Sequence, residues 1–194
     1  MQGRPLRVLP MNSGAEAVET AVKLARKWAY EVKGVPDHAA TIIVAERNFH
    51  GRTMMAISLS TDADSYGHFG PLVPNVIKVP FNDLPALERA LASTPNIAAF
   101  MVEPVQGEAG IIVPAADYMS RAHALCQKHR ALLIADEVQT GLCRTGRMLA
   151  VDHSGTRPDI LVLGKALSGG VYPISAVLAR DGSWRIGDFN VVLS

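Results

Sequence analysis

The sequence contains little cysteine and no long apolar or basic run, and each absence removes a class of protein. Its two cysteines, Cys126 and Cys143, lie in different segments and match no metal or redox spacing, so we expect reduced thiols and no metal site. No apolar stretch approaches the roughly 20 residues that cross a bilayer, so we expect no membrane partner. The formal net charge is +1 and no basic cluster interrupts the chain, which gives no reason to expect nucleic acid.

The composition is typical of a soluble intracellular protein. At 194 residues, of which 48% are hydrophobic, the chain is long enough for one sizeable core. Its first residues have neither the apolar core of a signal peptide nor the length of a transit peptide, so we expect no targeting segment. No internal repeat, low-complexity segment or linker divides the sequence.

Short apolar runs alternate with helical patterns along most of the chain. Strands are predicted at residues 41–45, 76–81, 97–102, 131–135, 160–163 and 174–179. Helices are predicted at about residues 14–33, 54–60, 82–91 and 117–129, whereas residues 7–12 are expected only to lead into the first helix. This alternation predicts an α/β fold with a mostly parallel sheet and helices on both faces.

Four side chains suited to binding or catalysis fall just after predicted strands: Phe49, Glu103, Asp136 and Lys165. Ligands of open α/β sheets bind beyond the carboxyl ends of the strands, so we expect these residues to converge there. Lys165 could form a Schiff base with a carbonyl, or simply reach solvent. An ionised Asp136 at the end of a buried strand requires a cationic or hydrogen-bonding partner.

The segment after the first buried strand mixes aromatic, imidazole and guanidinium groups. Phe49 could stack on a planar ligand or pack in the core. His50 could be an ordinary surface imidazole. Arg52 could bind a substrate carboxylate in a bidentate fork or pair with a carboxylate of the protein. Farther along, Glu103 and Glu108 could serve acid–base chemistry, cap helices or lie on the surface.

The start of the first predicted helix is a candidate anion site. Ser13 is a good N-cap, and the small residues Gly14 and Ala15 let a ligand approach the free amides of the first turn. These amides and the hydroxyl group would suit a phosphate. A plain capped helix is the alternative interpretation.

One cofactor would use this helix start and the strand ends together. Phe49 and Val138 would contact the two faces of a planar ring. Asp136 would keep a pyridinium nitrogen protonated, and Gln139 would hydrogen-bond a phenolic oxygen. Lys165 would condense with an aldehyde. These contributions predict pyridoxal 5′-phosphate as the cofactor.

Five sequence blocks, in their order, resemble class III pyridoxal-phosphate-dependent aminotransferases. The blocks are residues 12–17 (NSGAEA), 49–53 (FHGRT), 103–108 (EPVQGE), 136–141 (DEVQTG) and 163–170 (LGKALSGG). Within the class, three further blocks are most similar to the ornithine aminotransferases: residues 69–71, 82–88 and 157–160. The resemblance extends from about residue 8 to residue 179.

The resemblance implies the large cofactor-binding domain of an aspartate aminotransferase-like fold, here incomplete. Residues 1–179 would form this portion of the domain, and residues 180–194 would be a divergent tail. Members of the family are longer at both ends, so part of the substrate site and a phosphate-binding threonine of the neighbouring subunit would be missing. The resemblance also implies a homodimer once those segments are supplied, located in the cytoplasm or the mitochondrial matrix.

The implied reaction is transamination of L-ornithine with 2-oxoglutarate to glutamate 5-semialdehyde and glutamate, a step of arginine metabolism and proline biosynthesis. Lys165 would carry the cofactor as a Schiff base and shuttle a proton, with Asp136 as the second catalytic residue. Arg52 matches the family position for a substrate carboxylate, and Glu108 matches a glutamate paired with an arginine of the C-terminal domain. There are two alternatives: another class III enzyme, such as acetylornithine aminotransferase, and a non-catalytic fragment. We expect the isolated chain to be poorly active.

Overall fold

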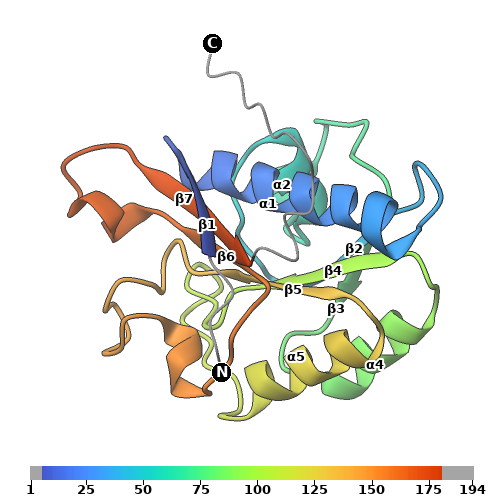
Figure 1. Ribbon diagram of the computed structural model, residues 1–194. Coiled ribbons are helices and arrows are strands. Elements are labelled where there is room, and N and C mark those ends of the chain that lie inside the picture. Colours follow the sequence, from blue (N-terminus) through green and yellow to red (C-terminus); the bar gives the residue numbers. More distant parts are fainter. Residues whose placement is uncertain (1–5, 181–194) are drawn as a thin grey trace.

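Within residues 6–180, which the computed structural model describes, seven strands form one sheet in the order β1-β7-β6-β5-β4-β2-β3. The strands are β1 (Leu6–Met11), β2 (Thr41–Ala45), β3 (Val76–Val79), β4 (Ile97–Val102), β5 (Leu132–Asp136), β6 (Ile160–Leu163) and β7 (Ser175–Arg180). Strands β2 to β6 run parallel to one another, whereas β7 runs antiparallel to both of its neighbours. The predicted mostly parallel sheet is confirmed (Figure 1).

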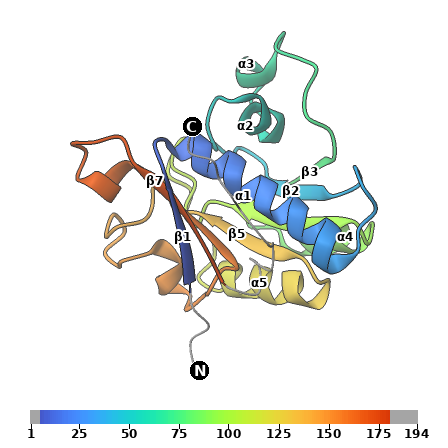
Figure 2. The ribbon, with the colours of Figure 1, turned by 45° about the horizontal axis from the view of Figure 1, so that its top comes forward.

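Helices cover both faces of this sheet, as predicted. The longest helix, α1, crosses one face, while α4 and α5 lie on the other (Figure 1 and Figure 2). The helical elements are α1 (Gly14–Trp28), its π-helical continuation η1 (Ala29–Lys33), α2 (Met54–Leu59), α3 (Ala63–Tyr66), α4 (Leu84–Ala92), α5 (Tyr118–Lys128), η2 (Ala150–His153) and η3 (Lys165–Ser168). In the part of the chain that the structure describes, no helix combines the length and apolar character needed to cross a membrane.

Two apolar cores, one on each side of the sheet, explain this layering. In β4 the successive residues Phe100 and Met101 are both fully buried but belong to different cores, because neighbouring side chains of a strand point to opposite faces. Met101 shares its core with Leu24 of α1, and Phe100 shares its core with Tyr118 of α5. Burial on both faces is why the central strands are continuous apolar runs.

Sequence signals place both ends of α1. Ser13 Oγ accepts a hydrogen bond from the Glu16 N–H (3.2 Å), and the Glu16 carboxylate accepts one from the Ser13 N–H (2.8 Å), which forms a capping box. At the other end, the helical turns continue to Lys33. Gly34 then takes a left-handed conformation with φ of 82° and stops the helix before Pro36.

Two predictions, one at each edge of the sheet, differ from the structure, and a third lies outside the described residues. Residues 7–12 were expected only to lead into α1, but most of them belong to β1, which pairs along its length with β7. This edge strand has weak local signals because Val8 is exposed, the strand contains Pro10, and its partner lies near the other end of the sequence. The strand predicted at 76–81 ends at Val79, just before Pro80. The predicted tail at 180–194 lies outside the described residues except for Arg180, so the domain boundary at residue 179 stays a prediction.

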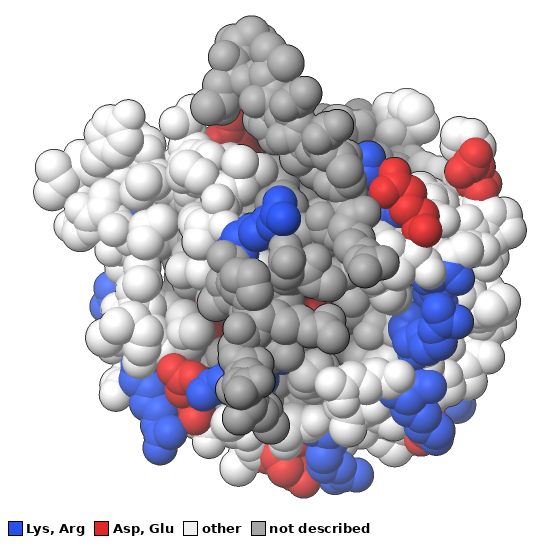
Figure 3. Space-filling view, in the orientation of Figure 1, with Lys and Arg blue, Asp and Glu red and all other residues white. Residues whose placement is uncertain are grey.

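Charges are spread over the surface of the molecule. On the face shown in Figure 3, Lys and Arg side chains are interspersed with Asp and Glu side chains around the rim. Exposed ion pairs include Lys27–Glu31 and Lys128–Glu88. Such pairs contribute about 0–1 kcal/mol each, so the stability of the fold rests on the two apolar cores.

Candidate functional site

A cavity of about 320 Å³ opens at the carboxyl ends of the parallel strands. It is lined by Gly14, Ala15, Phe49, His50, Gly51, Arg52, Glu103, Val105, Asp136, Val138, Gln139, Thr140 and Lys165. All four strand-end residues that were predicted to converge belong to this lining, and so do most of the other candidate site residues. The exceptions are Ser13, which caps α1, and Glu108, which lines a neighbouring cavity together with Phe49.

The start of α1 forms part of the cavity wall. The capping box occupies the N–H groups of Ser13 and Glu16, whereas no described residue accepts a hydrogen bond from the N–H of Gly14 or Ala15. Ser175 Oγ donates to the Ser13 carbonyl oxygen (2.6 Å) and so ties the helix start to β7. Because a helix N-terminus carries partial positive charge, this part of the wall suits an anion.

Asp136 ends β5 and is held by two donors. Its Oδ1 accepts a hydrogen bond from the Val138 N–H (3.0 Å), and its Oδ2 lies 2.6 Å from His50 Nδ1. The His50 side chain is 0% exposed and that of Asp136 4% exposed. His50 is therefore the partner that a buried Asp136 requires, and its interpretation as a surface imidazole is wrong.

The protonation of His50 is set by its surroundings. Burial disfavours the imidazolium, but the hydrogen bond to Asp136 and the negative charges of Asp136 and Glu103 outweigh burial, so the pKa of His50 is raised. The other ring nitrogen, Nε2, has no hydrogen-bond partner among the described residues. A protonated His50 donates through Nδ1 to the Asp136 carboxylate.

Glu103, at the end of β4, adds a third buried titratable group. The residue is 5% exposed, and its Oε2 accepts a hydrogen bond from the Phe49 N–H (3.2 Å). Burial raises the pKa of Glu103 to about 7, although the charge of His50 opposes the rise. Glu103 is neither a helix cap nor a surface charge, which leaves acid–base chemistry among its predicted roles.

Lys165 begins η3, with Gly164 between it and β6, and remains accessible. Its side chain is 49% exposed, and its Nζ lies 3.9 Å from Glu108 Oε1. The backbone φ of 39° falls in the left-handed region, which non-glycine residues rarely adopt, so the conformation is strained by about 1 kcal/mol. Such strain concentrates at functional sites. The amine of Lys165 is thus held at the cavity without being locked in a buried ion pair.

Arg52 and Gln139 already make contacts within the protein. The guanidinium of Arg52 lies 5.5 Å from the centroid of the Phe49 ring, a cation–π contact. Gln139 Nε2 donates to Glu108 Oε1 (3.3 Å). Within residues 6–180, Arg52 pairs with no carboxylate, which leaves its fork of N–H donors for a ligand.

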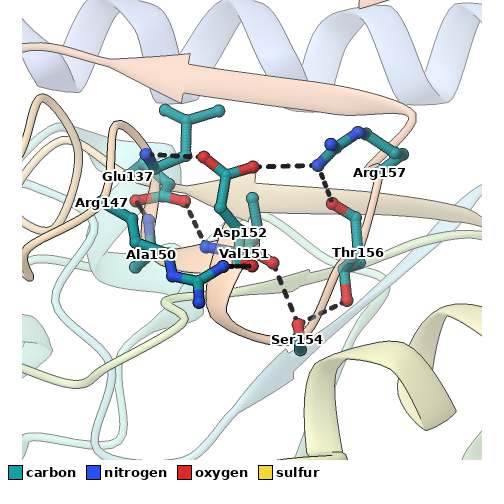
Figure 4. A network of polar contacts seen from close by, with 9 residues as sticks. Glu137, Arg147, Ala150, Val151, Asp152, Ser154, Thr156 and Arg157 are labelled. Carbon is teal, nitrogen blue, oxygen red and sulfur yellow. Dashed lines mark hydrogen bonds and ion pairs between the residues drawn. The ribbon is translucent and has the colours of Figure 1, made fainter.

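Glu137, to which the sequence patterns assign no role, anchors the turn behind Asp136. It is 1% exposed, and its carboxylate accepts hydrogen bonds from the N–H groups of Ala150 (2.8 Å) and Val151 (2.9 Å), shown in Figure 4. It also accepts one from Thr140 Oγ1 (2.7 Å). Burial raises the pKa of Glu137, and these three donors oppose the rise. The network fixes the turn that carries three of the cavity-lining residues, Val138, Gln139 and Thr140.

The same network continues through Asp152. Its Oδ2 accepts a hydrogen bond from the Leu149 N–H (3.1 Å), and its Oδ1 accepts one from Arg157 (2.9 Å). Arg147 donates to the Asp152 carbonyl oxygen (2.9 Å; Figure 4). These contacts order the connection between β5 and β6, and β6 delivers Lys165 to the cavity.

Comparison with known proteins agrees with this geometry. The family model described as aminotransferase class-III matches residues 2–186. The chain is 62% identical over 175 residues to the mitochondrial ornithine aminotransferase of Rattus norvegicus, an alignment that covers 90% of this chain and 40% of that protein.

Two solved structures are also similar. An ornithine aminotransferase of Toxoplasma gondii, described with partial occupancy of PLP at its active site, matches with a TM-score of 0.90 and 56% identity over 92% of this chain and 42% of that chain. An acetylornithine aminotransferase of Elizabethkingia anophelis matches with a TM-score of 0.76 and 52% identity over 92% and 40%. The chain therefore spans about two fifths of the length of these relatives. It belongs to the class III aminotransferase family.

Proposed function

We propose that this chain is the cofactor-binding part of a pyridoxal-phosphate-dependent aminotransferase that transfers the δ-amino group of L-ornithine to 2-oxoglutarate. The products are glutamate 5-semialdehyde and glutamate. The observation that carries the proposal is the presence, in one cavity, of Lys165, the Asp136–His50 pair and the start of α1. The 62% identity to a rat ornithine aminotransferase supports the choice of amino donor.

The cavity residues fit pyridoxal phosphate in size and chemistry. The volume of about 320 Å³ lies at the lower end of the range of small-ligand sites, about 300–1,000 Å³. The N–H groups at Gly14 and Ala15 suit the phosphate, and Phe49 and Val138 offer apolar surfaces for the ring. The buried carboxylate of Asp136 suits a protonated pyridine nitrogen.

When bound, the cofactor supplies an electron-accepting ring that stabilises negative charge on the substrate carbon. Asp136 would hold the proton on the ring nitrogen, because His50 and the Val138 N–H keep its carboxylate in place. Lys165 would hold the cofactor through its amine until the substrate amine displaces it, and the freed Nζ would then take up and return the proton of the substrate carbon.

Arg52 and Glu108 are the proposed substrate-binding residues. Arg52 would bind a substrate carboxylate through its guanidinium N–H groups while its planar face stays on the Phe49 ring. Glu108 lies 3.9 Å from the Lys165 amine and accepts a hydrogen bond from Gln139 (3.3 Å), so its charge lies beside the reacting group. We assign Glu108 the role of helping one site accept two substrates of different charge.

Covalent attachment of the cofactor tests the first half of the proposal. The purified chain should develop visible absorbance with pyridoxal phosphate, and borohydride reduction should leave a phosphopyridoxyl group on the peptide that contains Lys165. Lys165→Ala should abolish both signals. Lys128→Ala is the matched control, because Lys128 is exposed and pairs with Glu88 far from the cavity. Attachment at other lysines, or no attachment, would contradict the assignment.

Turnover tests the second half. Semialdehyde formation from L-ornithine and 2-oxoglutarate should exceed formation from N-acetylornithine. The reverse preference would assign the chain to the acetylornithine enzymes, an alternative that the 52% identity to one of them makes specific. Because the chain spans about two fifths of its relatives' length, we expect slow turnover by the chain alone. Attachment at Lys165 with no turnover would favour a non-catalytic fragment.

A homodimer and a location in the cytoplasm or mitochondrial matrix belong to the same proposal. Both rest on the family to which the chain belongs and on the mitochondrial rat relative. Light scattering of the purified protein tests the dimer, and fractionation of cells that make the protein tests the location.

A further inference from the structure

One side chain, Val138, fills a slot between two glycines of different elements. Gly14 is the first residue of α1, and Gly164 lies between β6 and Lys165. A Cβ atom at Gly14 would lie 2.8 Å from Val138 Cγ1. A Cβ atom at Gly164 would lie 3.2 Å from the same methyl group and 3.6 Å from the Gly14 Cα. Three chain elements thus meet at a single isopropyl group.

The two glycines are required for space and not for backbone freedom. Gly14 occupies the first position of a regular helix. Gly164 has a φ of −173°, an extended conformation that any residue adopts. By contrast, Gly169 has a φ of 68°, where glycine is favoured for its backbone. Alanine at position 164 would therefore be opposed mainly by the methyl group of Val138.

The three elements that meet at Val138 carry the separate parts of the cavity. The start of α1 offers N–H groups to an anion, and η3 carries the Lys165 amine. The turn after β5 carries Val138 itself, whose N–H also holds Asp136 Oδ1 (3.0 Å). Protein interiors are packed at crystal density, so an added methyl group moves whole elements by tenths of an ångström and is not absorbed locally.

We propose that the Gly14–Val138–Gly164 contact sets the distance between the anion-binding start of α1 and the amine of Lys165, so that one phosphorylated aldehyde engages both at once. The inference rests on the proposed function. Binding at two points is tight only when the spacing of the two points matches the ligand, and functional groups must be held within about 0.5 Å. Gly164, which does not line the cavity, is then a positioning residue that acts through Val138.

The test compares pyridoxal phosphate with pyridoxal, which carries the aldehyde but no phosphate. Gly164→Ala should weaken the affinity for pyridoxal phosphate about tenfold or more, because both points can no longer be reached together. The affinity for pyridoxal, which engages only the lysine, should change less than about threefold. In a Val138→Ala background the methyl clash is absent, so adding Gly164→Ala should leave the affinity for pyridoxal phosphate unchanged.

Gly141→Ala is the matched control. A Cβ atom there would meet the Glu137 carbonyl oxygen at 2.8 Å and Leu163 Cδ2 at 3.1 Å, so this variant is also crowded, but by other atoms. Thermal unfolding of the cofactor-free proteins should show that Val138→Ala restores the stability lost in Gly164→Ala and does not restore that lost in Gly141→Ala.

Two outcomes would overturn the inference. One is equal loss of affinity for both aldehydes in Gly164→Ala, and the other is an effect of Gly164→Ala that is the same with valine or alanine at position 138. Either result leaves the proposed function intact as long as pyridoxal phosphate attaches to Lys165 of the unchanged protein. Failure of that attachment overturns the inference and the proposed function together.

Discussion

Replacing Glu103 with glutamine measures how much a buried charge beside the cavity lowers the free energy of unfolding. The residue is 5% exposed, and its carboxyl group has one hydrogen bond within residues 6–180, from the Phe49 N–H (3.2 Å). Glutamine has nearly the same shape and keeps an oxygen that can accept this bond. The substitution Glu103→Gln therefore removes the ionisable group with little change in packing, and mimics a carboxyl group that stays protonated.

The sign and size of the effect follow from the pKa. Burial raises the pKa of Glu103 from 4.5 to about 7, so the folded protein keeps a proton that the unfolded chain releases between these two pH values. The stabilising effect of that proton is complete below pH 4.5 and is lost as the pH rises toward 7. At 1.36 kcal/mol per pKa unit, the loss amounts to about 3 kcal/mol. We expect Glu103→Gln to be more stable than the unchanged protein by up to about this amount at pH 8, and equally stable at pH 4.

Urea unfolding at several pH values measures this difference directly. Glu108→Gln is the matched control, because it removes a carboxylate from the same edge of the sheet but one whose side chain is 52% exposed. We expect that control to change the free energy of unfolding by less than about 0.5 kcal/mol. A difference between Glu103→Gln and the unchanged protein that stays constant from pH 5 to pH 8 would refute the argument, since only a titrating group produces the slope.

Further predictions concern three other groups. His50→Gln should destabilise the protein most at acidic pH, because the raised pKa of His50 makes its stabilising contribution complete below about pH 6.5 and lost at higher pH; urea unfolding at pH 6 and pH 9 measures this. Glu137→Ala should cost about 3 kcal/mol or more, seen as a lower melting temperature, because it leaves buried N–H groups without an acceptor. Asp83→Ala should cost only about 1 kcal/mol in the same assay, because it removes the N-cap of α4, where Asp83 Oδ1 accepts from the Ala86 N–H (2.8 Å).

The fold was predictable where burial of a strand requires a continuous apolar run in the sequence. The strands β2, β4 and β6 match their predicted ranges because each is buried and, apart from Thr41, entirely apolar. β1 was missed because an edge strand needs no such run: its register with β7, from Leu6 opposite Arg180 to Met11 opposite Ser175, is fixed by contacts between distant ends of the sequence. Local sequence patterns do not indicate that β1 pairs with β7.

The same distinction holds within the site. The position of Asp136 just after an apolar strand was enough to predict that it needs a partner. The identity of the partner was not predictable, because His50 lies 86 residues away and a surface histidine has the same local sequence. The space requirement at Gly164 was equally hidden, since it depends on Val138 and Gly14 from other elements.

Asp136 and Glu137 show how one strand sends neighbouring acids to opposite sides of a sheet. In β5, Ile134 faces the core under α1, whereas Ala135 faces the core under α5. The side chains keep alternating through Asp136, the last residue of β5, and Glu137, which follows it. Asp136 therefore lies on the side of the sheet that α1 covers, and Glu137 lies on the other side. Both are buried, but they are satisfied differently: the partner of Asp136 is a titratable imidazole, while Glu137 is held by three donors that do not titrate. The alternation of side chains therefore places the Asp136 carboxylate in the lining of the cavity and its neighbour Glu137 in the hydrogen-bond network behind the turn.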